Sequence, residues 1–204
     1  MQKTPLKKVV VATSNNGKMQ EIRQIMRSVP LELISMGELW NSRVEIKETG
    51  STFQENALIK AEWVYKESGL WALADDSGLE VDALGGRPGV FSARFAGENA
   101  DAEQNNRKLL DQLKNVSSAN RSARFRCVLV LKTGEDSCLC AEGVCQGRIG
   151  FEPLGSNGFG YDPLFIPDGL DRTFAQLSSE QKHGLSHRAK ALKSLVEKLN
   201  AILL

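Results

Sequence analysis

Two adjacent carboxylates follow a buried apolar segment near the middle of the chain. Asp75 and Asp76 come directly after Leu70–Ala74 and precede Ser77 and Gly78. Side chains alternate along a strand, so the two carboxylates cannot both face one way. Ligands of open α/β sheets bind at the carboxyl ends of strands, so one carboxylate is expected to enter a cleft. There it would bind a hard cation or activate water. A simple turn is the alternative, since Asp and Gly favour turns.

Further polar candidates lie upstream of this pair. Glu48 precedes Thr49 and Gly50 and could supply a second carboxylate to the same metal ion. Asn56 and Lys60 are four residues apart, so they share one face of the expected helix. Taken alone, each of these two is more typical of a surface residue.

The polar segment Thr13–Lys18 lies between an apolar strand and a helix. A helix N-terminus offers unpaired N–H groups and the positive end of the helix dipole, which together favour an anion. Lys18 opposes that dipole unless a phosphate is bound. The segment is not a Walker A loop, because it lacks the leading glycine and Met19 replaces the magnesium-binding Ser or Thr. Phosphate binding and a polar turn with a solvated lysine both stay open.

A glycine-rich segment, Gly155–Pro163, contains two aromatic residues, Phe159 and Tyr161. Glycines permit close approach of backbone to a ligand, and an aromatic face can stack on a base. Packing of both rings into the core is the alternative.

Three donor side chains, Lys182, His187 and Arg188, lie near the start of the last expected helix. His183 and His187 are four residues apart, as in a zinc-binding helix. However, Gly184 replaces the glutamate of that motif and no third ligand is evident, so zinc is not expected. The donors suit an anion or a carbonyl oxygen better.

The hydrophobic spacing predicts a mixed α/β protein without a linker. Capping boxes are expected at Thr52–Glu55, Asp101–Gln104 and Ser178–Gln181. Gly155–Asp168 is expected to contain no regular element. The expected strands are Lys8–Ala12, Leu70–Ala74, 79–83, Phe125–Leu131 and Cys138–Cys145. Four helices are expected. The first runs from Lys18 to about Val29, the second from Thr52 to about Gly69, the third begins at Asp101, and the last is a single helix that begins at Ser178.

Composition excludes several classes of protein. The 26 Lys and Arg against 25 Asp and Glu give a net charge of +1, without the basic surplus of a nucleic-acid-coating protein. No apolar run approaches the roughly 18 residues of a membrane helix. The run Val9–Ala12 is too short for a signal-peptide core, so we expect a cytoplasmic protein. The four cysteines form no Cys-x-x-Cys pair and are expected to be small apolar side chains.

The order of six sequence blocks resembles one family, the inosine/xanthosine triphosphate pyrophosphatases, which remove deaminated purine nucleotides. The resemblance runs from about residue 8 to the C-terminus. The blocks are Val10–Glu21, Glu48–Ala57, Ala74–Leu79, Pro88–Arg94, Gly158–Pro163 and Ser186–Arg188.

The resemblance implies a fold and a reaction. The fold would be a long curved mixed sheet with helices forming two lobes around a central cleft, as a single domain over residues 1–204. The enzyme would be a homodimer that uses Mg²⁺ to hydrolyse a purine nucleoside triphosphate (ITP, dITP or XTP) to the monophosphate and pyrophosphate. No nucleic-acid or membrane partner is implied.

The resemblance also implies roles for individual residues. Asp76 would bind the metal ion and act as the base for the attacking water, and Glu48 would be the second metal ligand. Asp75, Lys18 and Lys60 would complete the catalytic set. Lys47 stands where some members place a further acid, which leaves the number of metal ions open. The substrate-binding residues would be Thr13, Ser14, Asn15, Asn16, Gly17, Lys18, Ser77, Arg94, Phe159, Gly160, Tyr161, Asp162, Lys182, His187 and Arg188.

Two competing functions are compatible with parts of this pattern. One is a related pyrophosphatase of the septum-inhibitor family acting on pyrimidine or modified nucleotides, which the Gly158–Pro163 and Ser186–Arg188 blocks disfavour. The other is a nucleotide sensor without turnover, which the set of Glu48, Asp76 and Lys18 disfavours.

Overall fold

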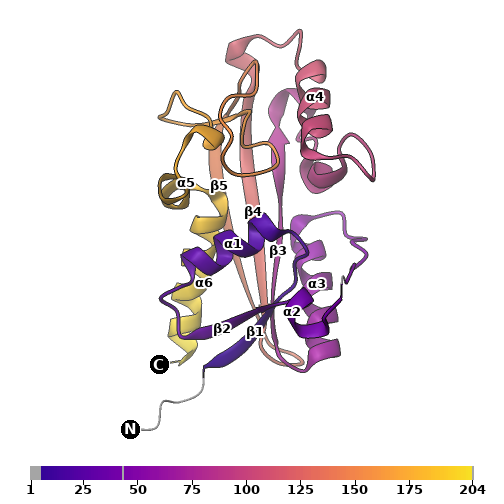
Figure 1. The fold of residues 1–204 in the computed structure, drawn as a ribbon, viewed down its shortest axis with the longest axis vertical. Coiled ribbons are helices and arrows are strands. Elements are labelled where there is room, and N and C mark those ends of the chain that lie inside the picture. The colour runs from indigo at the N-terminus through magenta and orange to yellow at the C-terminus, as the bar shows by residue number, and fades with distance from the viewer. Residues whose placement is uncertain (1–5, 43, 204) are drawn as a thin grey trace. The chain divides into compact units, whose positions relative to one another are not determined.

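A computed structural model of the chain describes residues 6–42 and 44–203, and its elements are labelled in Figure 1. The strands are β1 (Lys7–Val11), β2 (Leu31–Ser35), β3 (Trp71–Val81), β4 (Ser122–Lys132), β5 (Cys138–Ile149) and β6 (Phe165–Pro167). The α-helices are α1 (Asn16–Ile25), α2 (Met36–Trp40), α3 (Phe53–Ser68), α4 (Ala102–Gln112), α5 (Ser179–Leu185) and α6 (His187–Leu203). Short 3₁₀ helices are η1 (Asp82–Leu84), η2 (Gly89–Arg94), η3 (Ser118–Asn120) and η4 (Phe174–Gln176).

The six strands form one mixed sheet in the order β2-β1-β3-β4-β5-β6. β1 pairs in parallel with both β2 and β3, whereas β5 and β6 are antiparallel. Val9, Val10 and Val11 of β1 are fully buried, as expected for an apolar strand inside a parallel arrangement. The predicted mixed α/β class is confirmed.

Two compact units divide the chain. The first unit contains the residues up to Asp76, Val128–Glu142 and the chain from Ala191 onwards; the second contains Ser77–Cys127 and Gly143–Lys190. Each unit therefore consists of several chain segments. The expectation of a single domain stays a prediction. No helix in the described part of the chain is long and apolar enough to span a bilayer.

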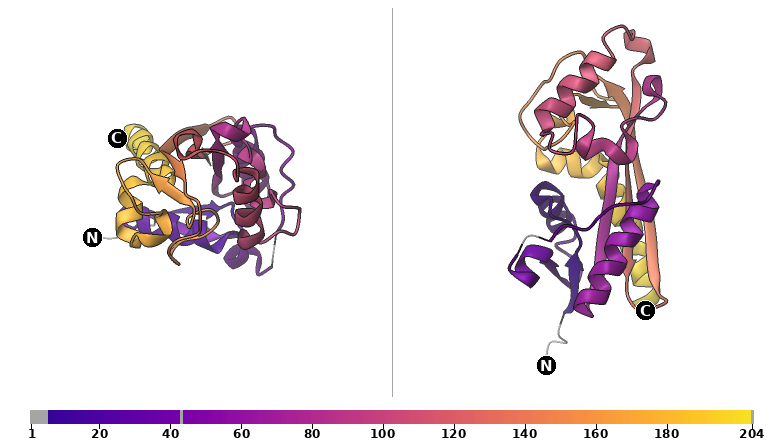
Figure 2. Two further views of the ribbon diagram at one scale, coloured as in Figure 1. Left: turned by 90° about the horizontal axis from the view of Figure 1, so that it is seen from above. Right: turned by 90° about the vertical axis from the view of Figure 1, so that its right-hand side faces the viewer.

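In the first unit, α3 lies beside the first half of β3 (Figure 2). The predicted capping box is present, since Thr52 accepts from the Glu55 N–H and Glu55 accepts from the Thr52 N–H. The helix ends as predicted at Gly69, whose φ of +66° suits a residue without a Cβ. Its face with Phe53, Ala57, Ala61 and Val64 is buried. This helix is long enough to bring Lys60 against β3.

In the second unit, α4 begins with the predicted capping box at Asp101 and buries Leu109. The other core residues of the second unit surround a cluster of aromatic rings. Phe125 packs edge-on against Phe165 at 4.7 Å between ring centroids, and Phe165 lies 5.1 Å from Phe174.

The predicted hairpin is also confirmed, as β4 and β5 are neighbours joined by the turn at Thr133–Ser137.

The prediction for the region around Asp75 and Asp76 was wrong. The segments Leu70–Ala74 and 79–83 were expected to be separate strands with a polar break between them, but β3 runs without interruption through Asp75–Gly78. The carboxylates thus lie in the middle of a strand, not at its carboxyl end. Ion pairs with lysines allow these polar residues to stay in an extended, buried segment.

The prediction of one final helix was also wrong. α5 ends at Leu185, and Ser186 is extended with ψ of 153°. The Ser186 hydroxyl accepts from the Ala189 N–H at 3.2 Å and caps the start of α6. Leu185, expected in the buried stripe, is 39% exposed.

Smaller differences concern short elements. α1 ends at Ile25 rather than near Val29. Val29 directly precedes Pro30, and a residue before proline disfavours the helical conformation. β2 and α2 were not predicted, because each has only five residues. β6 lies inside the segment expected to be irregular. Of the four free cysteines, Cys127 and Cys145 are buried as expected, whereas Cys138 is exposed and Cys140 half-buried.

Candidate active site

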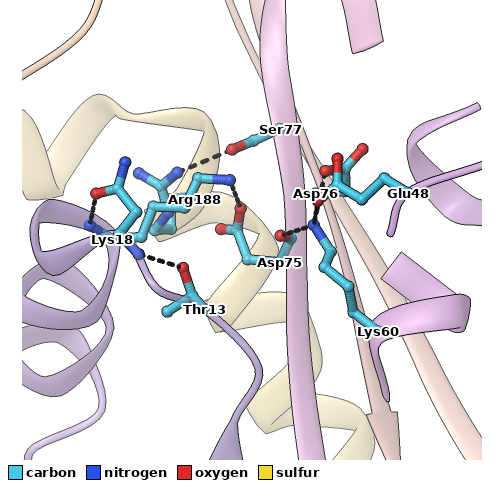
Figure 3. A network of polar contacts seen from close by, with 9 residues as sticks. Thr13, Lys18, Glu48, Lys60, Asp75, Asp76, Ser77 and Arg188 are labelled. Carbon is cyan, nitrogen blue, oxygen red and sulfur yellow. Dashed lines mark hydrogen bonds and ion pairs between the residues drawn. The ribbon is translucent and has the colours of Figure 1, made fainter. Parts of the chain in front are cut away.

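Asp75 and Asp76 point to opposite sides of β3 (Figure 3). On one side, Asp75 Oδ1 lies 2.7 Å from Lys18 Nζ, and the Asp75 side chain is fully buried. Lys18 comes from the first turn of α1, where a cation opposes the helix dipole. The carboxylate of Asp75 offsets that unfavourable position. The predicted alternation of the two carboxylates is confirmed.

On the other side of β3, one lysine joins two carboxylates. Lys60 Nζ lies 2.8 Å from Asp76 Oδ1 and 2.8 Å from Glu48 Oε1, and it donates to the carbonyl oxygen of Asp75 at 2.9 Å. Lys60 and Asp76 are 7% and 6% exposed. Lys60 is therefore not a surface residue, contrary to the alternative drawn from sequence.

The ion pairs alter the titration of both partners. Burial raises the pKa of Asp76 above 3.8, and the charges of Lys60 and Lys18 only partly oppose this. Burial acts to lower the pKa of Lys60, but the carboxylates of Asp76 and Glu48 outweigh it and raise that pKa. Lys60 thus stays charged, while Asp76 accepts a proton more readily than an ordinary aspartate does.

The second oxygen of the Asp76 carboxylate is suited to a further ligand. Asp76 Oδ2 is buried and has no hydrogen-bond partner among the described residues. Glu48, which shares Lys60 with it, is partly exposed. Carboxylate oxygens are the preferred ligands of Mg²⁺, so the two side chains fit such an ion together with water or phosphate oxygens. Within residues 6–42 and 44–203, no group of three or more His, Cys, Asp or Glu forms a metal cage.

The predicted phosphate segment Thr13–Lys18 forms the start of α1. Asn15 is the N-cap residue, and its Oδ1 accepts from the Lys18 N–H at 3.0 Å. The first turn contains no acidic residue, which leaves the positive end of the helix dipole available to an anion. Thr13, Ser14 and Asn16 line a pocket of about 580 Å³.

In the second unit, a cationic and aromatic cluster forms around Phe159. Lys182 Nζ and Arg188 Cζ lie 4.9 and 5.6 Å from the centroid of the Phe159 ring. Asp162 Oδ2 accepts from the Phe159 N–H at 2.9 Å and from Lys182 Nζ at 2.5 Å. Arg188 is almost fully buried and donates to the hydroxyl of Ser77 at 2.9 Å (Figure 3). Five predicted substrate-binding residues are therefore brought together.

Three other predicted residues of the second unit lie differently. Tyr161 is 4% exposed, and its hydroxyl donates to the carbonyl oxygen of Ser92 at 2.9 Å. His187 stacks on Phe125 with 4.7 Å between ring centroids. Arg94 pairs loosely with Glu98 at 3.6 Å. Tyr161 and His187 thus contribute to packing, and their substrate contacts stay predictions.

Two buried asparagines lie next to these clusters: Asn56, which taken alone was expected at the surface, and Asn106, which sequence reasoning missed. Asn56 is fully buried, and its Oδ1 accepts from the N–H of Gly50, two residues after Glu48. Asn106 of α4 donates to the carbonyl oxygen of Gly160. The available signal was that each asparagine occupies a position of the apolar helix stripe, three residues from Phe53 and from Leu109 respectively.

The chain is similar to several known proteins. The chain is 45% identical over 196 residues to the dITP/XTP pyrophosphatase of Bacillus subtilis (strain 168), which covers 96% of this chain and 98% of that protein. The solved structures of the Staphylococcus aureus Ham1 protein and of a HAM1 protein from Coxiella burnetii match with TM-scores of 0.84 and 0.85. Both proteins are 42% identical to this chain in sequence, and each match covers 96% of it. The match covers 99% of the Staphylococcus aureus protein and 100% of the Coxiella burnetii protein.

These matches confirm the enzyme class predicted from sequence, a nucleoside triphosphate pyrophosphatase. The family model described as the Ham1 family matches residues 9–198, nearly the whole chain. The chain therefore belongs to the Ham1 family.

Proposed function

We propose that this enzyme hydrolyses deaminated purine nucleoside triphosphates (ITP, dITP and XTP) to the monophosphate and pyrophosphate. The name shared by its relatives, dITP/XTP pyrophosphatase, supports this substrate class. The observation that carries the proposal is the arrangement on β3, where Asp75 pairs with Lys18 and Asp76 shares Lys60 with Glu48.

The first unit supplies groups that suit phosphate chemistry. A triphosphate carries about four negative charges near neutral pH, and fixed cations reduce its repulsion of a nucleophile. Lys18 and the start of α1 would bind phosphate oxygens. Asp76, whose pKa is raised by burial, is suited to accept the proton of the attacking water.

Glu48 and Asp76 would hold Mg²⁺. When bound, the ion supplies further neutralisation of phosphate charge. Lys60 would keep the two carboxylates close together, because its ammonium contacts both at 2.8 Å.

The second unit supplies groups that suit recognition of a base. Hypoxanthine and xanthine carry a carbonyl oxygen at position 6, where adenine carries an amino group. Lys182 and Arg188 can only donate hydrogen bonds. An amino group facing them would leave buried donors unpaired, at a cost of about 1–3 kcal/mol each. Phe159 offers the aromatic face for stacking.

The remaining features of the proposal follow from the family resemblance. The enzyme would work as a homodimer in the cytoplasm, as one domain, without nucleic-acid or membrane partners. Ser77 and Arg94 would contact the nucleotide together with Thr13–Gly17. These assignments are independent of the acidic cluster and can fail separately from it.

The test is pyrophosphate release with Mg²⁺, measured in parallel for inosine, xanthosine, adenosine and guanosine triphosphates. We expect fast release from the first two and little from the others. Guanine also carries a carbonyl oxygen at position 6, so its exclusion requires a contact other than these donors. Equal release from all four would reject the assignment of Lys182 and Arg188 to base selection. Tight binding without release from any would favour a nucleotide sensor, and preference for a pyrimidine or modified nucleotide would favour the septum-inhibitor type of pyrophosphatase.

A further inference from the structure

Two neighbouring asparagines of α4 bind two different segments of the second unit. Asn105 and Asn106 are only 5% and 7% exposed. Asn105 holds the end of η2, since its Oδ1 accepts from the Ala96 N–H at 2.7 Å and its Nδ2 donates to the Ala93 carbonyl oxygen at 3.0 Å. Both functional groups of Asn105 are thus used within its immediate surroundings.

Asn106 instead contacts the glycine-rich segment. Its Nδ2 donates to the carbonyl oxygen of Gly160 at 3.0 Å. Its Oδ1 is buried and has no hydrogen-bond partner in the part of the chain that the structure describes. Asn106, Phe159 and Gly160 line a cavity of about 480 Å³. A buried carboxamide with one unpaired acceptor costs free energy, so its contact with Gly160 is not explained by core stability alone.

A fourth hydrogen bond closes the connection. Tyr161, next to Gly160, donates from its hydroxyl to the Ser92 carbonyl oxygen in η2 at 2.9 Å. Ser92 is itself fixed, because its hydroxyl accepts from the Leu79 N–H at 2.9 Å and donates to the Gly89 carbonyl oxygen at 2.6 Å. α4, η2 and the glycine-rich segment therefore hold one another in a closed set of side-chain hydrogen bonds.

The Gly160 peptide is a sensitive point of this segment. Gly160 has φ of +62°, and it lies directly between Phe159 and Tyr161. Residues 158–164 form bends and turns rather than a helix or strand, and the side chain of Asn106 binds the carbonyl oxygen of Gly160 within them. A displaced Gly160 carbonyl would move the ring of Phe159 and the carboxylate of Asp162, which both contact Lys182.

We propose that Asn106 is a positioning residue that sets the Phe159–Asp162 segment for binding of the purine base. It would act through the Gly160 carbonyl, without touching the substrate. This inference rests on the proposed function, because it assigns the segment to base binding.

The test compares N106L, which keeps a similar shape without the donor, with D111N as the matched control. Asp111 also lies on α4 and forms an exposed ion pair with Lys114. For N106L we expect the KM for dITP to rise about tenfold with kcat within about twofold, as loss of one hydrogen bond implies. The preference for dITP over dATP should fall, and D111N should match the parent enzyme. An unchanged KM and preference in folded N106L would overturn the proposal.

Two further measurements cover the other outcomes. If N106L does not fold, Y161F removes the hydrogen bond from Tyr161 to Ser92 that closes the same set, without altering α4, and an unchanged KM in Y161F would overturn the proposal. If the parent enzyme releases no pyrophosphate from any purine triphosphate, the proposed function fails. Amide hydrogen exchange then decides the positioning role. Faster exchange over residues 158–162 in N106L, with β1 unchanged, is expected, and unchanged exchange there would reject the role.

Discussion

The two units bury polar side chains in different surroundings. In the first unit, three carboxylates and two lysines form ion pairs on both sides of β3. In the second unit, one buried ion pair, Lys182 with Asp162, lies among aromatic rings and neutral groups. Lys182 lies 4.9 Å from the Phe159 ring centroid, and Arg188 binds the hydroxyl of Ser77.

This difference indicates a division of chemical roles. A cluster with an excess of carboxylates and a buried, unpartnered oxygen at Asp76 is suited to cations and to proton transfer. Donor groups that lie against an aromatic ring, with a single carboxylate and a hydroxyl as partners, are suited to a flat neutral ligand with acceptor atoms. Substitutions in the first unit should therefore affect turnover, and substitutions in the second unit should affect the choice of base.

The largest expected effect is that of D76N. The amide cannot accept the proton of the attacking water, so we expect pyrophosphate release from dITP to fall at least about 100-fold. Nucleotide binding, measured by calorimetry, should be retained. The control is D136N, an exposed aspartate in the β4–β5 turn of the same unit. Normal turnover by D76N would remove Asp76 from the mechanism and with it the division of roles.

Local sequence signals predicted the elements that surround this cluster. β1 was predicted correctly because the apolar run Lys8–Ala12 is by itself typical of a buried strand. α3 was predicted correctly because the Thr52–Glu55 capping box marks its start and Gly69 marks its end. The interior of β3 was not predicted, because the sequence around Asp75 and Asp76 is typical of a turn. Their burial within a strand depends on ion pairs with Lys18 and Lys60, which come from other segments of the chain.

The same reasoning applies to the second unit. The motif around Phe159–Asp162 indicated a segment that the structure places against Lys182. The bond from Tyr161 to Ser92 joins residues 69 positions apart, so no local pattern contains it. The break at Ser186 was missed because its hydroxyl begins a new helix within an otherwise continuous apolar stripe.

The next effect concerns two glycines of the second unit. Gly158 has φ of +76°, and a Cβ there would collide with the Asp162 carboxylate. Gly160 has φ of +62°, but among the described residues no atom beyond its chain neighbours lies within 4 Å of its Cβ position. G160A should lower the unfolding free energy by about 1 kcal/mol through backbone strain alone, and G158A by about 2–3 kcal/mol. Chemical denaturation would measure both, and equal losses would show that Asp162 does not constrain the segment.

A smaller effect is expected for R188M, which removes the donors and keeps an unbranched side chain. The preference for dITP over dATP should fall about tenfold, because an unpaired donor no longer penalises adenine. K190M is the control, since Lys190 is exposed on the same helix and binds the Val144 carbonyl oxygen. An early thermal transition with unchanged preference would assign Arg188 to packing.

The smallest effect tests the dependence of the first unit on charge. Arg23 and the N–H of Ser35 lower the pKa of Glu38 from 4.5 to about 2. The folded state therefore binds this proton less tightly than the unfolded state. The resulting stabilisation is present above pH 4.5 and is lost as the pH falls towards 2. Because Glu38 is half exposed, the contribution is small. Between pH 5 and 2.5, the thermal midpoint of E38Q should fall less than that of the parent enzyme, whereas E32Q, at an exposed residue of β2, should follow the parent. Parallel curves for E38Q and the parent would show that this ion pair does not stabilise the first unit.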